Sequence, residues 1–152
     1  MKDPEGKPYK RPESVLVLVY TPRAEVLILE RRTPAGFFQS VTGSLEWGEF
    51  PPEAAERELR EETGWIPQTP PVDCGLTAEF EILPEWRGRF PPGTCSNREH
   101  VFCWRCPGTW SVQLQPDEHV SWRWLAFDRA LAVCSSWSNR RALCQVLPTR
   151  LP

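Results

Sequence analysis

Basic residues are not in excess in this 152-residue chain, which has 18 Lys and Arg against 20 Asp and Glu and a formal net charge of −2. The chain therefore lacks the positive charge with which nucleic-acid-binding proteins neutralise phosphates, although a local basic patch could still face a small anion. No apolar run approaches the roughly 18–20 residues of a membrane span. These absences argue against nucleic-acid and membrane partners. With 40% hydrophobic residues, the composition instead suits a globular domain.

Histidine is scarce, with only His100 and His119, whereas there are six cysteines. Cys103 and Cys106 have the C-x-x-C spacing of some zinc and redox sites. A zinc site would need two more ligands at matching spacing, and a redox pair would be expected at the start of a helix rather than in a strand. We therefore expect small buried side chains here. The first ten residues, MKDPEGKPYK, contain no apolar signal core, so we expect reduced thiols and a cytoplasmic location.

The apolar pattern predicts one α+β domain over residues 1–152, with an irregular, Pro-rich lead-in over residues 1–12. A long loop is expected at Pro84–Arg98. Strands are predicted at Ser14–Tyr20, Val26–Glu30, Phe37–Val41, Thr77–Leu83, Glu99–Cys106 and Ser121–Phe127. Helices are predicted from Pro51 to a stop at Gly64, at Asp128–Val133 and at Asn139–Val146.

Three glutamates in the first of these helices point to chemistry. Glu58, Glu61 and Glu62 fall within a sector of about 100° on the helix surface. A solvated charged face is the ordinary explanation, but like charges four residues apart repel, and the helix dipole disfavours anions in the last turn. A divalent cation would reverse both penalties. Carboxylates that do not form a full cage suit Mg²⁺, which shares its coordination with water and substrate phosphates.

The segment from Gly43 to Trp65 resembles the Nudix box, G-x5-E-x7-R-E-U-x-E-E-x-G-U, where U is a bulky apolar residue. Members of the Nudix family hydrolyse nucleoside diphosphates linked to another moiety, with Mg²⁺ or Mn²⁺ bound by the box helix. The resemblance therefore implies a hydrolase with Mg²⁺ as cofactor, Mn²⁺ being possible. It also implies an α/β/α sandwich around a mixed sheet, which agrees with the predicted elements.

The resemblance also implies roles for individual residues of the box. Glu58 and Glu62 would be metal ligands, and Glu61 a ligand or an aid to base chemistry. The remaining fixed positions would be structural, with an Arg57–Glu49 ion pair, a Gly43 carbonyl near the metal and Gly64 at the end of the helix.

Outside the box, the chain resembles the branch of the family that removes pyrophosphate from dihydroneopterin triphosphate in bacterial folate synthesis. The matching segments are Tyr9–Pro12, Arg31-Arg32, Phe38–Ser44, Glu79–Ile82, Arg87–Gly93, Glu118-His119 and Ser136–Arg140. The chain departs from the pattern at Trp65, at the C-terminal LPTRLP and at the two cysteines of the C-x-x-C pair.

This second resemblance implies that Glu118 completes the metal site, although an isolated loop glutamate is ordinarily solvated. The proton of the attacking water would go to Glu61 or Glu118. Substrate-binding residues would be Lys10, Arg31, Thr42, Phe80, Glu81, Ile82, Leu83, Ser136 and Trp137.

Charge and shape are compatible with these assignments. A triphosphate needs cations besides the metal, and Lys10, Arg31, Arg87 and Arg89 are candidates, the last two also being explicable as surface residues. Glu81 could accept hydrogen bonds from the donor edge of a pterin. Trp137 could stack on the ring, although a core position would explain it too.

Two other functions stay open at the level of sequence. A Nudix hydrolase could act mainly on nucleoside triphosphates such as dATP or oxidised dNTPs, because a purine and a pterin are both flat and of similar size. A Nudix module could instead bind a metabolite without cleaving it, but such a module would be expected to lose box glutamates, and all are present.

Overall fold

The computed structural model, which describes residues 1–151, is built around strand β1 (Glu13–Tyr20), whose side chains are buried on both faces. Successive side chains of a strand point to opposite faces. Val15, Val17 and Val19 accordingly join one core cluster, while Leu16 and Leu18 join the other. The continuous apolar run in the sequence thus reflects a strand covered on both sides.

The sheet around β1 is mixed. Strand β1 runs parallel to β6 and antiparallel to β2 and β4, and the main path of the sheet is β3-β2-β1-β6-β5. Strand β4 pairs with the first half of β1 and β7 pairs with β2. The bounds are β2 (Glu25–Arg31), β3 (Phe38–Gln39), β4 (Val41–Ser44), β5 (Val72–Glu81), β6 (Ser96–Arg105) and β7 (His119–Ala126).

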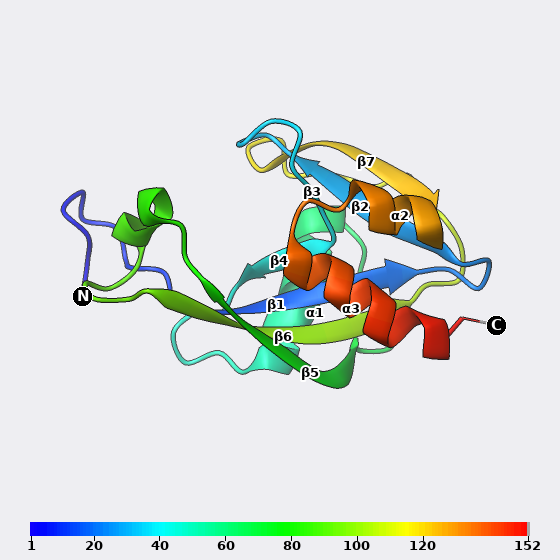
Figure 1. Ribbon diagram of the computed structural model, residues 1–152, viewed down its shortest axis with the longest axis horizontal. Coiled ribbons are helices and arrows are strands. Elements are labelled where there is room, and N and C mark those ends of the chain that lie inside the picture. Colours follow the sequence, from blue (N-terminus) through cyan, green and yellow to red (C-terminus); the bar gives the residue numbers. More distant parts are fainter. Residues whose placement is uncertain (152) are drawn as a thin grey trace.

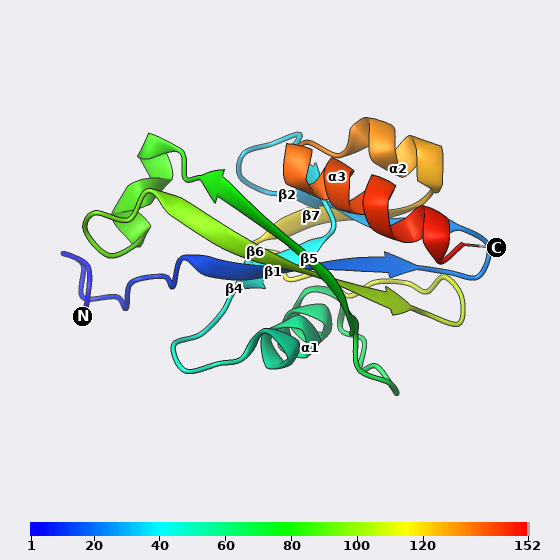
Figure 2. The ribbon, with the colours of Figure 1, turned by 60° about the horizontal axis from the view of Figure 1, so that its bottom comes forward.

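Helices cover both faces of this sheet, which confirms the predicted sandwich. Helix α1 (Pro51–Thr63) lies on one face, and α2 (Phe127–Val133) and α3 (Trp137–Val146) lie on the other (Figures 1 and 2). Two 3₁₀ helices, η1 (Pro84–Arg89) and η2 (Leu147–Thr149), complete the described chain. None of the helices in residues 1–151 has the length and apolarity that a membrane crossing requires.

Helix α1 begins and ends where the sequence predicts. Two prolines occupy its first turn, and the Glu53 carboxylate accepts a hydrogen bond from the amide of Phe50 (3.3 Å). At the other end Gly64 has a φ of 74°, and its amide donates to the carbonyl of Arg60 (2.8 Å). This left-handed conformation favours glycine and stops the helix.

Apart from shifts of one or two residues at other ends, the structure differs from the predicted elements in three places. Strand β5 begins at Val72, five residues early, because a bulge between Asp73 and Leu76 lets it stay paired with β6. The expected loop Pro84–Arg98 contains η1 and the start of β6. The short strand expected at Phe37–Val41 is two strands, β3 and β4, separated by Ser40.

Four of the eight tryptophans form one cluster beside the C-terminal end of α1. Trp65, Trp104, Trp110 and Trp124 have neighbouring ring centroids 4.7–6.1 Å apart. Trp110 belongs to the segment between β6 and β7, which is also held to α1 by a hydrogen bond from the amide of Gln113 to the carbonyl of Thr63 (3.0 Å). The cluster therefore holds the segment that leads into β7 against the end of α1.

Helix α3 is tied to the junction of β3 and β4 by Asn139, which is buried. Its Oδ1 accepts a hydrogen bond from the amide of Ser40 (2.8 Å), and its Nδ2 donates to the Ser40 hydroxyl (3.0 Å). The backbone amide and the hydroxyl group of Ser40 are thus both hydrogen-bonded to a single side chain of α3.

Replacing this side chain should destabilise the protein. We expect Asn139→Ala to lower the free energy of unfolding by about 1–3 kcal/mol, because the buried backbone amide of Ser40 loses its hydrogen-bond acceptor. Urea denaturation measures the change. Ser135→Ala is the control, because the bond that Ser135 accepts from the amide of Phe38 (2.9 Å) is exposed to solvent. Equal losses in the two variants would contradict this account.

Candidate active site

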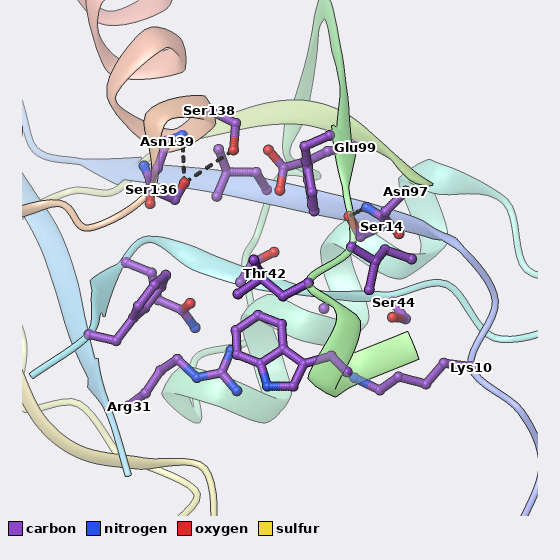
Figure 3. A pocket seen from close by; sticks show the side chains of 18 of the residues that line it. Lys10, Ser14, Arg31, Thr42, Ser44, Asn97, Glu99, Ser136, Ser138 and Asn139 are labelled. Atoms are coloured by element: carbon purple, nitrogen blue, oxygen red, sulfur yellow. Dashed lines mark hydrogen bonds between the residues drawn. The ribbon is translucent and has the colours of Figure 1, made fainter. Parts of the chain in front are cut away.

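A cavity of about 890 Å³ opens where the first half of β1, strand β4, the C-terminal half of α1, the region of η1 and the start of α3 meet. Figure 3 shows Lys10 and Arg31 on one side of it and Asn97, Glu99 and Ser138 on the opposite side, with Thr42 between them. One side of the cavity is thus lined by charged groups, whereas the opposite side is lined by a mixture of polar and apolar groups.

Three glutamates gather on the charged side. Glu58 and Glu62 project from α1 into the cavity and are buried, while Glu118 reaches it from the segment before β7 and is exposed. Side-chain atoms of Glu62, Glu118 and His119 lie within 4.8 Å of one another. The structure therefore brings together residues that are 56 positions apart in the sequence, Glu62 and Glu118.

Burial makes this cluster unfavourable as a set of free anions. It raises the pKa of Glu62, and the charges of Glu58 and Glu118 raise it further, against a hydrogen bond from the amide of Thr42 (3.2 Å). Burial likewise raises the pKa of Glu58 to about 7, although the neighbouring Arg57 opposes the shift. A cation bound among these carboxylates would remove the penalty.

The donor set fits a divalent metal ion. Carboxylate oxygens are the ligands that Mg²⁺ and similar hard cations prefer. Gly43 supports the fit, because a Cβ at this position would lie 2.2 Å from the Glu58 carboxyl group. The close approach of β4 to α1 thus requires glycine, and it places the backbone of Gly43 directly against the candidate ligand.

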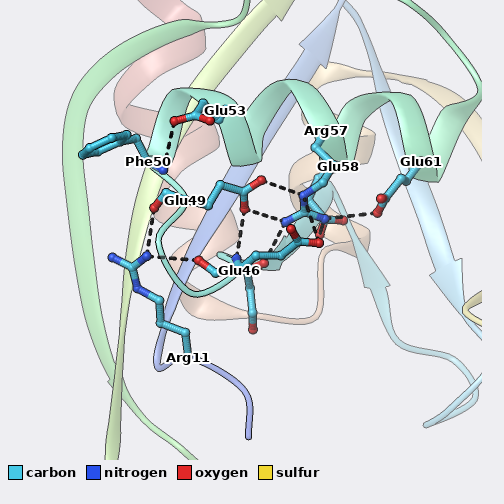
Figure 4. Close-up of polar contacts among 9 residues, drawn as sticks. Arg11, Glu46, Glu49, Phe50, Glu53, Arg57, Glu58 and Glu61 are labelled. Atoms are coloured by element: carbon cyan, nitrogen blue, oxygen red, sulfur yellow. Dashed lines mark hydrogen bonds and ion pairs between the residues drawn. The ribbon is translucent and has the colours of Figure 1, made fainter. Parts of the chain in front are cut away.

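Arg57 holds Glu58 and the preceding loop in place (Figure 4). Its Nε and Nη2 both donate to the Glu49 carboxylate at 2.8 Å, and Nη2 also donates to the carbonyl of Ser44 (3.0 Å). Its Nη1 donates to Glu58 (2.8 Å) and Glu61 (3.1 Å). The guanidinium keeps the pKa of Glu49 below its usual value, so this pair stays ionised.

Glu61 occupies a different position from the other two box glutamates. Its side chain is 50% exposed and is turned to Arg57. It does not line the cavity in the described chain. Of the two residues that the sequence left open as proton acceptors, Glu118 is therefore the one inside the cavity.

His119 lines the cavity, but the sequence analysis gave it no role in the site although it belongs to the matching segment Glu118-His119. It is buried, and its Nε2 lies 3.2 Å from the amide nitrogen of Gln39. Burial and the charge of Arg31 lower its pKa to about 4, so the ring is neutral near pH 7. Its position next to Glu118 was the available signal.

Cations line the mouth of the charged side. Lys10, Arg31 and Arg89 all face the cavity, and the amide of Lys10 donates to the carbonyl of Arg89 (2.8 Å). Desolvation lowers the pKa of Lys10, and the charges of Arg89 and Arg31 lower it further. Arg87 is directed elsewhere, to the Glu81 carboxylate (2.6 Å) and the Ile82 carbonyl (2.8 Å).

The expected pterin-contacting residues line the other side of the cavity. These are Phe80, Glu81, Ile82, Leu83, Ser136 and Trp137, while Thr42, also expected to bind substrate, lies between the two sides. Ile82 is buried, whereas Trp137 is 49% exposed, so Trp137 is not a core residue. The Ser136 hydroxyl accepts a bond from the amide of Asn139 (3.0 Å) and so caps α3.

Several lining residues on this side were missed by the sequence analysis. Asn97 and Glu99 are buried in β6 on the face that also carries Val101 and Cys103. Asn97 fell inside the expected loop Pro84–Arg98. Glu99 fell inside the predicted strand, but its alternation with the core-facing Val101 and Cys103 was not used as a signal. Ser14 and Ser138 also line the cavity.

The C-x-x-C pair takes no part in the site. Cys103 and Cys106 are free and buried, as expected, and the Cys106 thiol contacts the carbonyl of Tyr20 (3.2 Å). Burial raises the pKa of Cys106 to about 11, so its thiol is protonated and unreactive near neutral pH.

Comparisons with known proteins agree with this geometry. The model of the NUDIX domain family matches residues 10–146. The chain is 44% identical to the dihydroneopterin triphosphate diphosphatase of Escherichia coli K12 over 95% of this chain and 96% of that protein, and 34% identical to the Haemophilus influenzae protein of the same name over 91% and 89%. The solved structure of the E. coli dihydroneopterin triphosphate pyrophosphohydrolase superposes with a TM-score of 0.87 at 41% identity, covering 94% of this chain and 99% of that chain.

The close contact at Gly43 generates a prediction about metal binding. Gly43→Ala should displace the Glu58 carboxyl group and weaken Mg²⁺ binding by about 10–100-fold, the usual effect of disturbing the support of a metal ligand. Isothermal titration calorimetry measures the affinity. Gly108→Ala is the control, since nothing lies within 4 Å of a Cβ built there. Unchanged Mg²⁺ affinity in Gly43→Ala would contradict the arrangement.

The raised pKa values of Glu58 and Glu62 predict how metal-free stability depends on pH. A carboxyl group whose folded-state pKa lies above its unfolded value stabilises the fold below the ordinary pKa of 4.5, and this contribution is lost as the pH rises through the folded value, about 7 for Glu58. Glu62→Gln should therefore gain stability over the parent as the pH rises from about 5 to about 8.

Urea denaturation in the presence of a chelator measures this difference. Comparing the two proteins cancels groups such as Glu49, whose lowered pKa acts in the opposite direction. Mg²⁺ should then stabilise the parent more than the variant. A difference between parent and variant that does not change with pH would show that Glu62 is not ionised at a cost in the folded protein.

Proposed function

The chain belongs to the NUDIX domain family, and on this basis we propose that it hydrolyses 7,8-dihydroneopterin 3′-triphosphate to the monophosphate and pyrophosphate, with Mg²⁺ as cofactor. The observation that carries the proposal is one cavity in which an acidic cluster, three cations and a surface suited to a flat ring adjoin. The two curated relatives described above, which match nearly the full length of the chain, bear the name of this activity.

Glu58, Glu62 and Glu118 are the residues that would hold the Mg²⁺ ion. When bound, Mg²⁺ polarises phosphoryl oxygens, lowers the pKa of a coordinated water and offsets negative charge in the transition state. Arg57 orients Glu58 through the bond at 2.8 Å, and the amide of Thr42 orients Glu62. The backbone of β4 and the loop before α1 therefore set the position of two ligands.

Lys10, Arg31 and Arg89 bind the phosphate groups. Arg31 is held by a bond from its Nε to the carbonyl of Thr33 (2.8 Å), and its guanidinium lies over the rings of Phe37 and Trp86 at 5.8 and 5.7 Å. This packing directs a preformed cation into the cavity. Charge-assisted hydrogen bonds to phosphate oxygens would then relieve the mutual repulsion of the three cations.

Glu118 accepts the proton of the attacking water. It lies in the cavity close to Glu62, whereas Glu61 is turned to Arg57 and solvent. A carboxylate has two oxygens, so Glu118 would retain an acceptor for the water proton while also being one of the residues that would hold Mg²⁺.

The ring of the substrate occupies the opposite side of the cavity. Phe80, Ile82 and Trp137 supply apolar surface there, and polar groups surround it. The substrate is thus a small molecule, with no nucleic acid or membrane required. The six free thiols fit a reducing compartment, so we place the reaction in the cytoplasm.

A comparison of kcat/KM tests the assignment. Dihydroneopterin triphosphate should be preferred over dATP and dGTP, with release of pyrophosphate in the presence of Mg²⁺. Glu62→Gln should lower kcat by about 10²–10⁴ with all substrates and leave the fold intact, which is the scale of losing a catalytic carboxylate. A parent enzyme that prefers dATP would overturn the substrate, and near-parental turnover by Glu62→Gln in saturating Mg²⁺ would overturn the metal site.

A further inference from the structure

Glu99 is a buried carboxylate that neither the metal site nor the phosphate-binding residues use. It lies in β6, is only 5% exposed and lines the polar side of the cavity beside Asn97 and Ser138 (Figure 3). Its neighbours across the sheet are Ala78 of β5 and Ser14 of β1, neither of which carries a charge.

The protein satisfies this carboxylate only in part. The Ser138 hydroxyl and the charge of Arg141 both lower the pKa of Glu99, but within residues 1–151 no protein group donates to its Oε1. Burial outweighs these two effects and raises the pKa of Glu99 to about 7. A buried acceptor without a donor is costly to the fold, so its presence in a cavity wall points to a donor supplied by the ligand.

Glu81, the carboxylate that the sequence suggested for this task, is less suited to it. Its side chain is 79% exposed and already accepts a 2.6 Å bond from Arg87. Water competes for an exposed carboxylate, so a hydrogen bond to it discriminates poorly between ligands. A buried carboxylate discriminates strongly, because a ligand without the matching donors leaves it unpaired.

We propose that Glu99 is the residue that determines base specificity, by accepting hydrogen bonds from a ring N–H and the adjacent exocyclic amine of the substrate. The inference rests on the proposed function and names the side chain that selects the ring. A pterin presents this donor–donor edge, and so does guanine. Adenine instead presents a ring-nitrogen acceptor beside its amine, and that lone pair would face the carboxylate.

The matched substitution is Glu99→Gln, which keeps the shape and replaces one acceptor oxygen with a donor amide. The amide matches the adenine edge and conflicts with the pterin edge. We expect the kcat/KM ratio of dihydroneopterin triphosphate over dATP to fall by about 100-fold or more. Mg²⁺ dependence should be unchanged, because Glu99 is not among the candidate metal ligands.

Two further variants sharpen the comparison. Glu79→Gln is the control, since Glu79 is exposed, pairs with Arg98 at 3.2 Å and lies outside the cavity lining. The kcat/KM ratio of this variant for dihydroneopterin triphosphate over dATP should equal that of the parent. Glu81→Gln tests the competing carboxylate. A ratio within about threefold of the parent in Glu99→Gln, or a fall confined to Glu81→Gln, would overturn the proposal.

The ratio of dGTP over dATP separates this inference from the proposed function. If the parent does not cleave the pterin substrate, the proposed function fails, but Glu99→Gln must still lower the dGTP preference. If the parent prefers the pterin and Glu99→Gln leaves both ratios unchanged, the function stands and the role of Glu99 fails.

The parent enzyme supplies a measurement that needs no variant. The charge that acts on Glu99 is that of Arg141 of α3, and burial raises the pKa of Glu99 to about 7. The ionisation of Glu99 should therefore govern selectivity across the neutral range. The dGTP over dATP ratio should rise with pH as the carboxyl group ionises, and effects on the metal site cancel because both substrates share it. A ratio independent of pH across the neutral range would contradict the proposal.

Discussion

The burial of two carboxylates on one face of α1 is the constraint on which the site depends. Glu58 and Glu62 face β4, and burial penalises their ionised forms. Arg57 holds the helix in place despite this cost, because its guanidinium donates hydrogen bonds to Glu49, to the carbonyl of Ser44 and to Glu58. The buried carboxylates thus reduce the stability of the metal-free fold, but they concentrate the negative charge that a divalent cation requires.

The parts of the fold and site that were predictable from sequence are those set by local pattern. The box predicted α1 with its end at Gly64, because proline, glycine and the helical spacing of glutamates act over one or two turns. The strand β1 was predictable from its apolar run. The early start of β5 was not, because its residues Val72–Gly75 join the sheet through a bulge stabilised by pairing with β6, a contact distant in sequence.

Residues brought to the site by tertiary packing were harder to identify. The resemblance to a known family pointed to Glu118, but nothing local places a loop glutamate beside Glu62; the tryptophan cluster and the bond from Gln113 to Thr63 fix the segment that carries it. Glu99 was missed for a related reason. A charged residue in an apolar strand reveals a cavity only when the helix opposite, here α3, leaves room for it.

The attachment of the N-terminal lead-in has a practical consequence for handling the protein. The carbonyl of Tyr9 accepts a bond from the Trp47 indole (2.7 Å), and the amide of Lys10 is bonded to Arg89 of η1. The lead-in and η1 lie at one end of the molecule and the end of α3 lies at the other (Figure 1). An affinity tag fused before Met1 would therefore lie at the same end of the molecule as the cations proposed to bind phosphate, whereas a C-terminal tag would extend from the opposite end, so the two tagged forms should be compared before kinetic work.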